Sequence, residues 1–162
     1  MSAELSLRVK QHLLDSIKHM KQIKACLNEE KTALQTRDLD QIELLAKQKQ
    51  ILLKNTQADI EARQQLITSA GFSVDDTGME KMIASLPENF AVALTKGWQQ
   101  LVDLHEDVQE INQTNGMIIN KGLQQVDTML GVVQGNPDAR SAKTYNAKGR
   151  STAALTRTLG QA

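Results

Sequence analysis

The chain has 162 residues, a formal net charge of zero, 23% charged residues and only 2% aromatic residues. This length fits one domain, and the balanced charge gives no indication of nucleic acid or a membrane surface as a partner. A single cysteine, Cys26, excludes an internal disulfide and is typical of a reducing compartment. The N-terminal segment lacks an apolar run long enough for a signal peptide or a membrane helix, so we expect a cytoplasmic protein without membrane insertion.

The composition favours an all-α fold, because aromatic residues and proline are scarce while helix-forming residues are abundant. The first predicted helix covers about residues 3–35. Its apolar residues recur at steps of three and four, and several recur every seven residues, which indicates packing along one seam. This stripe comprises Leu5, Val9, Leu13, Ile17, Met20, Ile23, Leu27 and Leu34.

A second helix is predicted over about residues 38–69, after a turn near residues 36–38. Asp38 is the predicted N-cap, with Gln41 at the capping-box position. Gly71 is predicted to end this helix as its C′ residue. The first two helices should therefore form a long antiparallel hairpin. The apolar stripe of the second helix comprises Leu39, Ile42, Leu45, Leu52, Ile60 and Ile67.

A short connector helix is predicted over about residues 78–85, capped by Asp76 or Thr77, and Pro87 suits the first turn of the next helix. That third long helix should cover about residues 88–133, where the apolar periodicity continues, so we expect an elongated coiled-coil-like bundle. Residues 1–133 would then form one helical domain. The remaining residues, 134–162, are polar and basic, and we expect this tail to be flexible and disordered. No strand is predicted.

The polar residues give no indication of an assembled active site. His12 and His19 are seven residues apart, too far for one metal ion, and His105 has no second histidine nearby. We expect all three histidines on the solvated surface and Cys26 buried as a small hydrophobic residue. The sequence therefore predicts a protein that acts through its surfaces, without a cofactor or metal, and not an enzyme.

Three stretches of the chain together resemble one known family. They are RDLDQIELLAKQKQILL at residues 37–53, EINQTNGMIINKGLQQVDTMLGVV at residues 110–133, and TYNAKGRS at residues 144–151. In this order and spacing they resemble the FlgN family of flagellar export chaperones, which serve the flagellar type III secretion apparatus. The resemblance implies a chaperone that binds the helical C-terminal segments of hook–filament junction proteins in the cytoplasm. It also implies that the chaperone prevents early assembly and delivers its cargo to the export gate.

The last third of the long helix is our candidate for cargo binding, because apolar residues occur there on more than one face and an amphipathic cargo helix needs an apolar groove. An ordinary core or a homodimer seam remains an equal alternative for any one residue. The family motif residues Asn112, Asn115 and Gly116 are expected to specify packing, with Gly116 allowing close helix approach. The cargo candidates are Met117, Ile118, Ile119, Leu123, Val126, Met129, Leu130 and Val133.

The only tyrosine of the chain, Tyr145, lies in the polar tail, where it has no core to join. By resemblance, this tyrosine docks the loaded chaperone on the cytoplasmic domain of the export gate protein. The docking motif around it comprises Tyr145, Asn146, Lys148, Gly149 and Arg150. The main alternative is a structural coiled-coil adaptor that forms homo-oligomers through its heptads and has no role in export.

Overall fold

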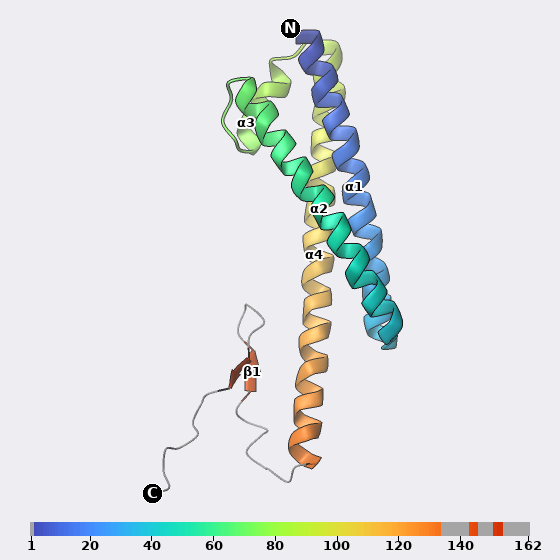
Figure 1. The fold of residues 1–162 in the computed structure, drawn as a ribbon. Coiled ribbons are helices and arrows are strands. Elements are labelled where there is room, and N and C mark those ends of the chain that lie inside the picture. The colour runs from blue at the N-terminus through green and yellow to red at the C-terminus, as the bar shows by residue number, and fades with distance from the viewer. Residues whose placement is uncertain (1, 134–142, 146–150, 154–162) are drawn as a thin grey trace, which may run out of the picture. The chain divides into compact units, whose positions relative to one another are not determined.

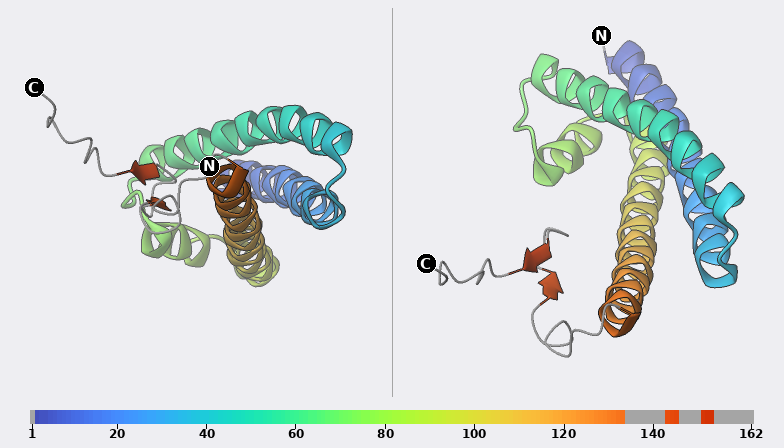
Figure 2. Two further views of the ribbon diagram at one scale, coloured as in Figure 1. Left: turned by 90° about the horizontal axis from the view of Figure 1, so that it is seen from below. Right: turned by 60° about the horizontal axis from the view of Figure 1, so that its bottom comes forward.

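The computed structural model describes residues 2–133, 143–145 and 151–153, and residues 2–133 are almost entirely helical. Four helices follow one another: α1 (Ser2–Thr36), α2 (Leu39–Ser69), α3 (Asp76–Ala84) and α4 (Glu88–Val133) (Figure 1). The chain divides into two compact units, Met1–Thr114 and Asn115–Ala162. The predicted all-α fold and the antiparallel hairpin of the first two helices are confirmed. Figure 2 shows α1 and α2 running side by side, beginning at the turn that connects them.

Both ends of α2 are formed as predicted. The Asp38 carboxylate is the N-cap and accepts a hydrogen bond of 3.2 Å from the Gln41 backbone N–H. At the other end Gly71 has a φ of 82°, and its N–H donates to the Thr68 carbonyl over 3.0 Å. The next N–H, of Phe72, donates to the Ile67 carbonyl over 3.1 Å. These two bonds form a Schellman motif, which requires a left-handed residue and therefore favours glycine at C′.

The C-terminal end of α1 has the same hydrogen-bond pattern with an arginine in place of glycine. Arg37 has a φ of 55°, its N–H donates to the Leu34 carbonyl over 3.4 Å, and the Asp38 N–H donates to the Ala33 carbonyl over 3.0 Å. A side chain in this conformation brings Cβ close to the backbone, which costs about 1–2 kcal/mol. The tight turn between α1 and α2 is therefore formed against the conformational preference of its central residue.

The connector helix α3 begins earlier than predicted, and its N-cap is Asp75, so the assignment to Asp76 or Thr77 is wrong. The Asp75 carboxylate accepts hydrogen bonds from the Gly78 N–H at 2.6 Å and from the Ser73 hydroxyl at 2.9 Å. Both hydrogen bonds lower the pKa of the Asp75 carboxyl, and the bond from the Gly78 backbone has the larger effect. A Cβ at Gly78 would lie 1.7 Å from the Ser73 carbonyl oxygen. The missing side chain at Gly78 thus allows Asp75 to act as the cap.

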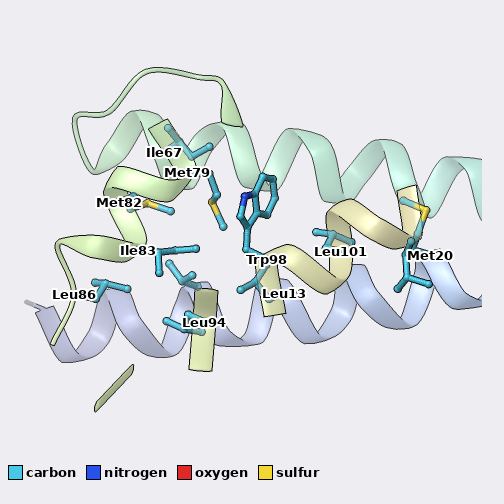
Figure 3. Packing of buried hydrophobic residues seen from close by; sticks show 12 residues of the cluster. Leu13, Met20, Ile67, Met79, Met82, Ile83, Leu86, Leu94, Trp98 and Leu101 are labelled. Carbon is cyan, nitrogen blue, oxygen red and sulfur yellow. The ribbon is translucent and has the colours of Figure 1, made fainter. Parts of the chain in front are cut away.

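The main hydrophobic core joins all four helices within residues 9–104. Figure 3 shows Trp98 of α4 among Met79 of α3, Ile67 of α2 and Leu13 of α1. A smaller cluster of Cys26, Ala33 and Leu45 lies between α1 and α2 near their connecting turn. The main core comprises Val9, Leu13, Met20, Ile67, Met79, Met82, Ile83, Leu86, Leu94, Trp98, Leu101 and Leu104.

The structure confirms most of the predicted apolar stripes on α1 and α2. Cys26 is 4% exposed, and burial raises the pKa of its thiol, as expected for a cysteine packed as a hydrophobic residue. Leu39 departs from the predicted stripe, because its side chain is 76% exposed. Leu39 is the first residue of α2, beside the turn, where the neighbouring helix does not bury its side chain.

Several polar contacts connect the long helices within residues 1–114, two of them made by lysines. The Lys49 ammonium of α2 donates to both carboxylate oxygens of Glu30 on α1, each over 3.4 Å, and to the Asn112 side-chain oxygen on α4 over 3.2 Å. The Lys24 ammonium of α1 forms an ion pair of 2.7 Å with Asp107 of α4. Because the Glu30 side chain is only 9% exposed, the contact with Lys49 helps to set the register of α1 and α2.

The tail contains two short strands, so the expectation of a chain without strands is wrong for this segment. β1 (Lys143–Tyr145) pairs antiparallel with β2 (Ser151–Ala153), with Thr144 opposite Thr152. Threonine and tyrosine favour extended backbone, but three residues are too few for an alternation of apolar and polar side chains to be recognised. The predicted disorder of the remaining tail concerns residues outside the described ranges.

Candidate functional site

The predicted cargo-binding residues form an exposed apolar face on the C-terminal part of α4. Their exposed fractions run from 43% for Ile119 to 83% for Val133, and only Ile118 is half-buried. A contiguous patch of large exposed apolar side chains commonly marks an interaction site. This face is the most prominent apolar surface of residues 115–133. The exposed members are Met117, Ile119, Leu123, Val126, Met129, Leu130 and Val133.

Five of these residues line up along one stripe, which we call the α4 seam. The α4 seam consists of Ile119, Leu123, Val126, Leu130 and Val133, whose successive spacings are four, three, four and three residues. At 3.6 residues per turn this spacing places them on one side of the helix, and it is the pattern of alternating a and d positions in a coiled coil. The α4 seam therefore matches a partner helix in both shape and periodicity.

The opposite side of the same segment is mainly polar, although Met117 and Val132 are also exposed there. Lys121, Gln124 and Thr128 lie there, and the Thr128 hydroxyl donates back to the Gln124 carbonyl over 2.9 Å. The segment is thus amphipathic, but it is one helix: within the described part of residues 115–162, no second helix accompanies it. The predicted groove is accordingly a helix face, and a partner helix would have to supply the other half of any groove.

The three motif residues occupy different environments. Asn112 is exposed and accepts the hydrogen bond from Lys49, and Asn115 is only 1% exposed. A Cβ added at Gly116 would have no atom within 4 Å. Close approach of a helix at Gly116, which we expected from the sequence, therefore stays a prediction.

The docking motif lies almost wholly outside the described residues. Tyr145 is the last residue of β1, where its backbone pairs opposite Ser151 of β2. The other motif residues, Asn146, Lys148, Gly149 and Arg150, fall in the range 146–150 that the structure does not describe. The docking role of this motif stays a prediction.

A cluster of charged residues between α1 and α2, together with Trp98 of α4, was missed from the sequence. The Arg63 guanidinium lies over the Trp98 ring, 5.4 Å from its centroid. The nearby Asp59 carboxylate is 2.7 Å from Nδ1 of His19. Asp59 and Arg63 occur within the apolar pattern that connects Leu52 to Ile67. This interruption was the signal that could have revealed a polar layer between the helices.

The same cluster overturns the surface assignment for two of the histidines. His12 is 8% exposed and lies 3.4 Å from the Ser16 hydroxyl, and His19 is half-buried against Asp59. Burial first, and the charge of Arg63 second, lower the pKa of His12. Only His105 has the exposed side chain that was predicted. Within the described residues, no group of three histidine, cysteine or acidic side chains is arranged to hold a metal ion.

None of the described helices combines the length and the apolar character that a membrane span requires.

The model of the FlgN protein family matches residues 1–153 of this chain. Among solved structures, the chain is similar to a crystal structure from Pseudomonas aeruginosa of a protein assigned as flagella synthesis protein FlgN. The TM-score is 0.62 and the sequence identity 27%, over 69% of this chain and 86% of that chain. No curated protein matches.

Proposed function

This chain belongs to the FlgN family, whose members have a chaperone-type role in flagellum assembly, and we propose that it is a cytoplasmic export chaperone for the hook–filament junction proteins. In this proposal it binds the C-terminal helical segments of those proteins, prevents their premature assembly and delivers them to the flagellar type III export gate. It acts by binding alone and catalyses no reaction.

The observation that carries this proposal is the α4 seam. Five aliphatic side chains in a coiled-coil spacing are exposed on one side of a helix, and each is at least 43% exposed. An amphipathic cargo helix that lies along this stripe would remove both apolar faces from water. The stripe covers only about two heptads, so the contact is short. A short seam favours an affinity that allows release of the cargo during export.

A methionine next to the α4 seam suits it to more than one cargo. Met129 is 68% exposed. The flexible, polarizable methionine side chain adapts to different apolar partners. A chaperone that serves more than one junction protein needs such tolerance.

Calorimetric titration with the purified C-terminal segments of the junction proteins tests the proposal. We expect dissociation constants in the micromolar range or tighter and a negative heat-capacity change, because apolar surface is buried. The double variant Leu123→Lys with Leu130→Lys should weaken binding at least a hundredfold. The matched control, Gln124→Lys with Thr128→Lys, adds the same charge to the polar side and should bind as the unchanged chain does. Equal binding by both double variants would remove the α4 seam from the proposal.

We assign the second step, docking on the export gate, to Tyr145. A lone aromatic residue flanked by basic residues has the form of a short linear motif, in which one anchor dominates a small interface. Tyr145→Ala should abolish binding of the loaded chaperone to the cytoplasmic domain of the gate protein while cargo affinity stays the same. Tyr145→Phe should retain most of the gate binding. An unchanged gate affinity in Tyr145→Ala would show that another part of the chain docks.

A homo-oligomeric adaptor is the second candidate, because the a and d spacing of the α4 seam also suits a second copy of this chain. Sedimentation equilibrium separates the two candidates. Under the chaperone proposal, the Leu123→Lys and Leu130→Lys variant loses cargo binding without a change in mass. Under the adaptor candidate, the unchanged chain is an oligomer that the same substitutions dissociate.

A further inference from the structure

A cavity of about 360 Å³ lies within residues 16–109, lined by side chains from all four helices. Its size is in the range of sites for small ligands and for anchoring side chains of peptides. Met20, Ile60 and Leu101 contribute apolar wall, and Trp98 and Arg63 lie beside one another in the lining. None of these residues belongs to the face proposed for cargo binding, so the two sites can be tested separately.

The Arg63 guanidinium is the most unusual group in this cavity. It is half-buried, and within the described part of the chain it forms neither a hydrogen bond nor an ion pair, although a guanidinium has five N–H donors. Burial lowers the pKa of Arg63, and the charges of Asp76 and Asp59 oppose this shift, so the guanidinium is held in a partly desolvated position near these two carboxylates. Stacking on Trp98 limits the orientations of the guanidinium plane, and a planar fork of this kind matches a carboxylate.

The acidic residues of the lining attract this cation, but within the described residues none of them forms an ion pair or a hydrogen bond with it. The Asp59 carboxylate is 2.7 Å from His19, which provides it with a partner. Asp76 and Glu106 have exposed side chains and therefore lie toward solvent. An anion that binds in this cavity would contact Arg63, while a neutral or basic neighbour of that anion would suit the acidic residues of the lining.

We propose that this cavity binds the C-terminal residue of a peptide, with its free carboxylate on Arg63 and an aliphatic side chain against Met20 and Leu101. Gln109, an exposed residue of the lining, supports a peptide rather than a fatty acid, because its side-chain amide forms no hydrogen bond in the described part of the chain. That amide can bind the peptide group that precedes a C-terminal residue, and a fatty acid has no such group.

The test uses Trp98, which is the only tryptophan of the chain and lines the cavity. N-acetyl-leucine carries an aliphatic side chain, one peptide-like group and a free carboxylate, so it stands for a C-terminal residue. We expect it to change the Trp98 fluorescence and to shift its single indole N–H signal in a saturable manner, with a low-millimolar dissociation constant. N-acetyl-leucinamide lacks the carboxylate and should bind at least tenfold more weakly.

Three variants and one further probe complete the test. Arg63→Gln should weaken binding of N-acetyl-leucine at least tenfold, and Arg63→Lys should be intermediate, because lysine keeps the charge without the fork. Arg8→Gln, at an exposed arginine outside the cavity, should bind as the unchanged chain does. Thermal unfolding followed by circular dichroism confirms that each variant is folded.

Equal binding of N-acetyl-leucine and N-acetyl-leucinamide, or unchanged binding by Arg63→Gln, would overturn the proposal. Tighter binding of hexanoate than of N-acetyl-leucine would overturn the peptide as the ligand.

Discussion

Single residues decide how the helices of this chain begin and end. Asp38, Asp75 and Gly71 each satisfy backbone groups that a helix end leaves without partners. Two of these roles could be predicted from residue type and position. Asp75 could not, because three acidic or hydroxyl residues in a row are all plausible caps, and the choice depends on the fold of the loop around Ser73.

Arg37→Gly should stabilise the protein by about 0.5–1 kcal/mol, because glycine adopts the left-handed conformation at this position without steric strain. Thermal unfolding should show a rise in Tm of about 2–4 °C. Arg37→Ala is the control, since it removes the guanidinium but keeps the strained backbone, and it should give no gain. An equal rise in both variants would mean that the side chain, and not the backbone, is responsible.

Gly78→Ala should destabilise the protein by more than about 2 kcal/mol, because the new Cβ would lie 1.7 Å from the Ser73 carbonyl oxygen and force the capping loop to move. Gly116→Ala is the matched control within a helix, where no atom lies within 4 Å of the added Cβ. It should gain up to about 1 kcal/mol from helix propensity. Chemical denaturation of both variants measures the difference.

The buried His12 should make the stability depend on pH. Because burial lowers its pKa below the ordinary value of 6.5, the unfolded chain binds this proton more readily than the folded one. The contribution is fully present above pH 6.5 and is lost as the pH falls toward the lowered pKa. Asp59 and Asp15 oppose this shift and Arg63 adds to it.

Denaturant titrations at pH 7.5 and 5.5 check this dependence. We expect the free energy of unfolding to fall by up to about 1 kcal/mol in the unchanged chain. His12→Gln should show a smaller fall, while His105→Gln, at an exposed histidine, should behave as the unchanged chain does. The same fall in both variants would assign the pH dependence to other groups.

At the scale of the elements, the apolar stripes predicted the helices, and polar contacts determine how the helices are aligned. The stripes of α1 and α2 leave several registers possible, since leucines at steps of three and four pack in more than one way. The contact of Lys49 with Glu30 and Asn112 favours one alignment, because another would leave the largely buried Glu30 carboxylate without this cation.

Lys49→Met should therefore destabilise the protein by about 1–3 kcal/mol, measured by chemical denaturation. The side chains of Lys49 and Glu30 have exposed fractions of 26% and 9%. Lys47→Met removes a lysine whose ion pair with Glu43 is 73% exposed on both sides, and it should change the stability by less than about 0.5 kcal/mol. Similar losses for the two substitutions would indicate that net charge, and not burial, matters here.

At the scale of the whole molecule, the core and the predicted interaction surfaces occupy different parts of the sequence. Every residue of the two buried clusters lies between Val9 and Leu104. The exposed α4 seam begins after them, at Ile119, and the predicted docking motif follows it. This separation lets the C-terminal surfaces remain available for partners without a cost to the stability of the core.

Removal of residues 134–162 should leave Tm within about 2 °C of that of the full chain, because both buried clusters lie outside this range. The shortened chain should still bind junction-protein segments and should lose binding to the gate protein. Calorimetry and thermal unfolding of the same preparation provide both measurements. A large fall in Tm would show that the tail contributes to the stability of the helices.

The sequence by itself determined the all-α fold, the helix hairpin, two of the caps and the positions of the apolar stripes. Periodicity and capping are local properties, so a single chain segment carries enough information to predict them. Only the tertiary structure decided which stretches of stripe are buried. It also brought Arg63, Trp98 and Asp59 together around a cavity and placed His12 and His19 between helices. Such contacts join residues that are far apart in the sequence, and no local pattern records which of them meet.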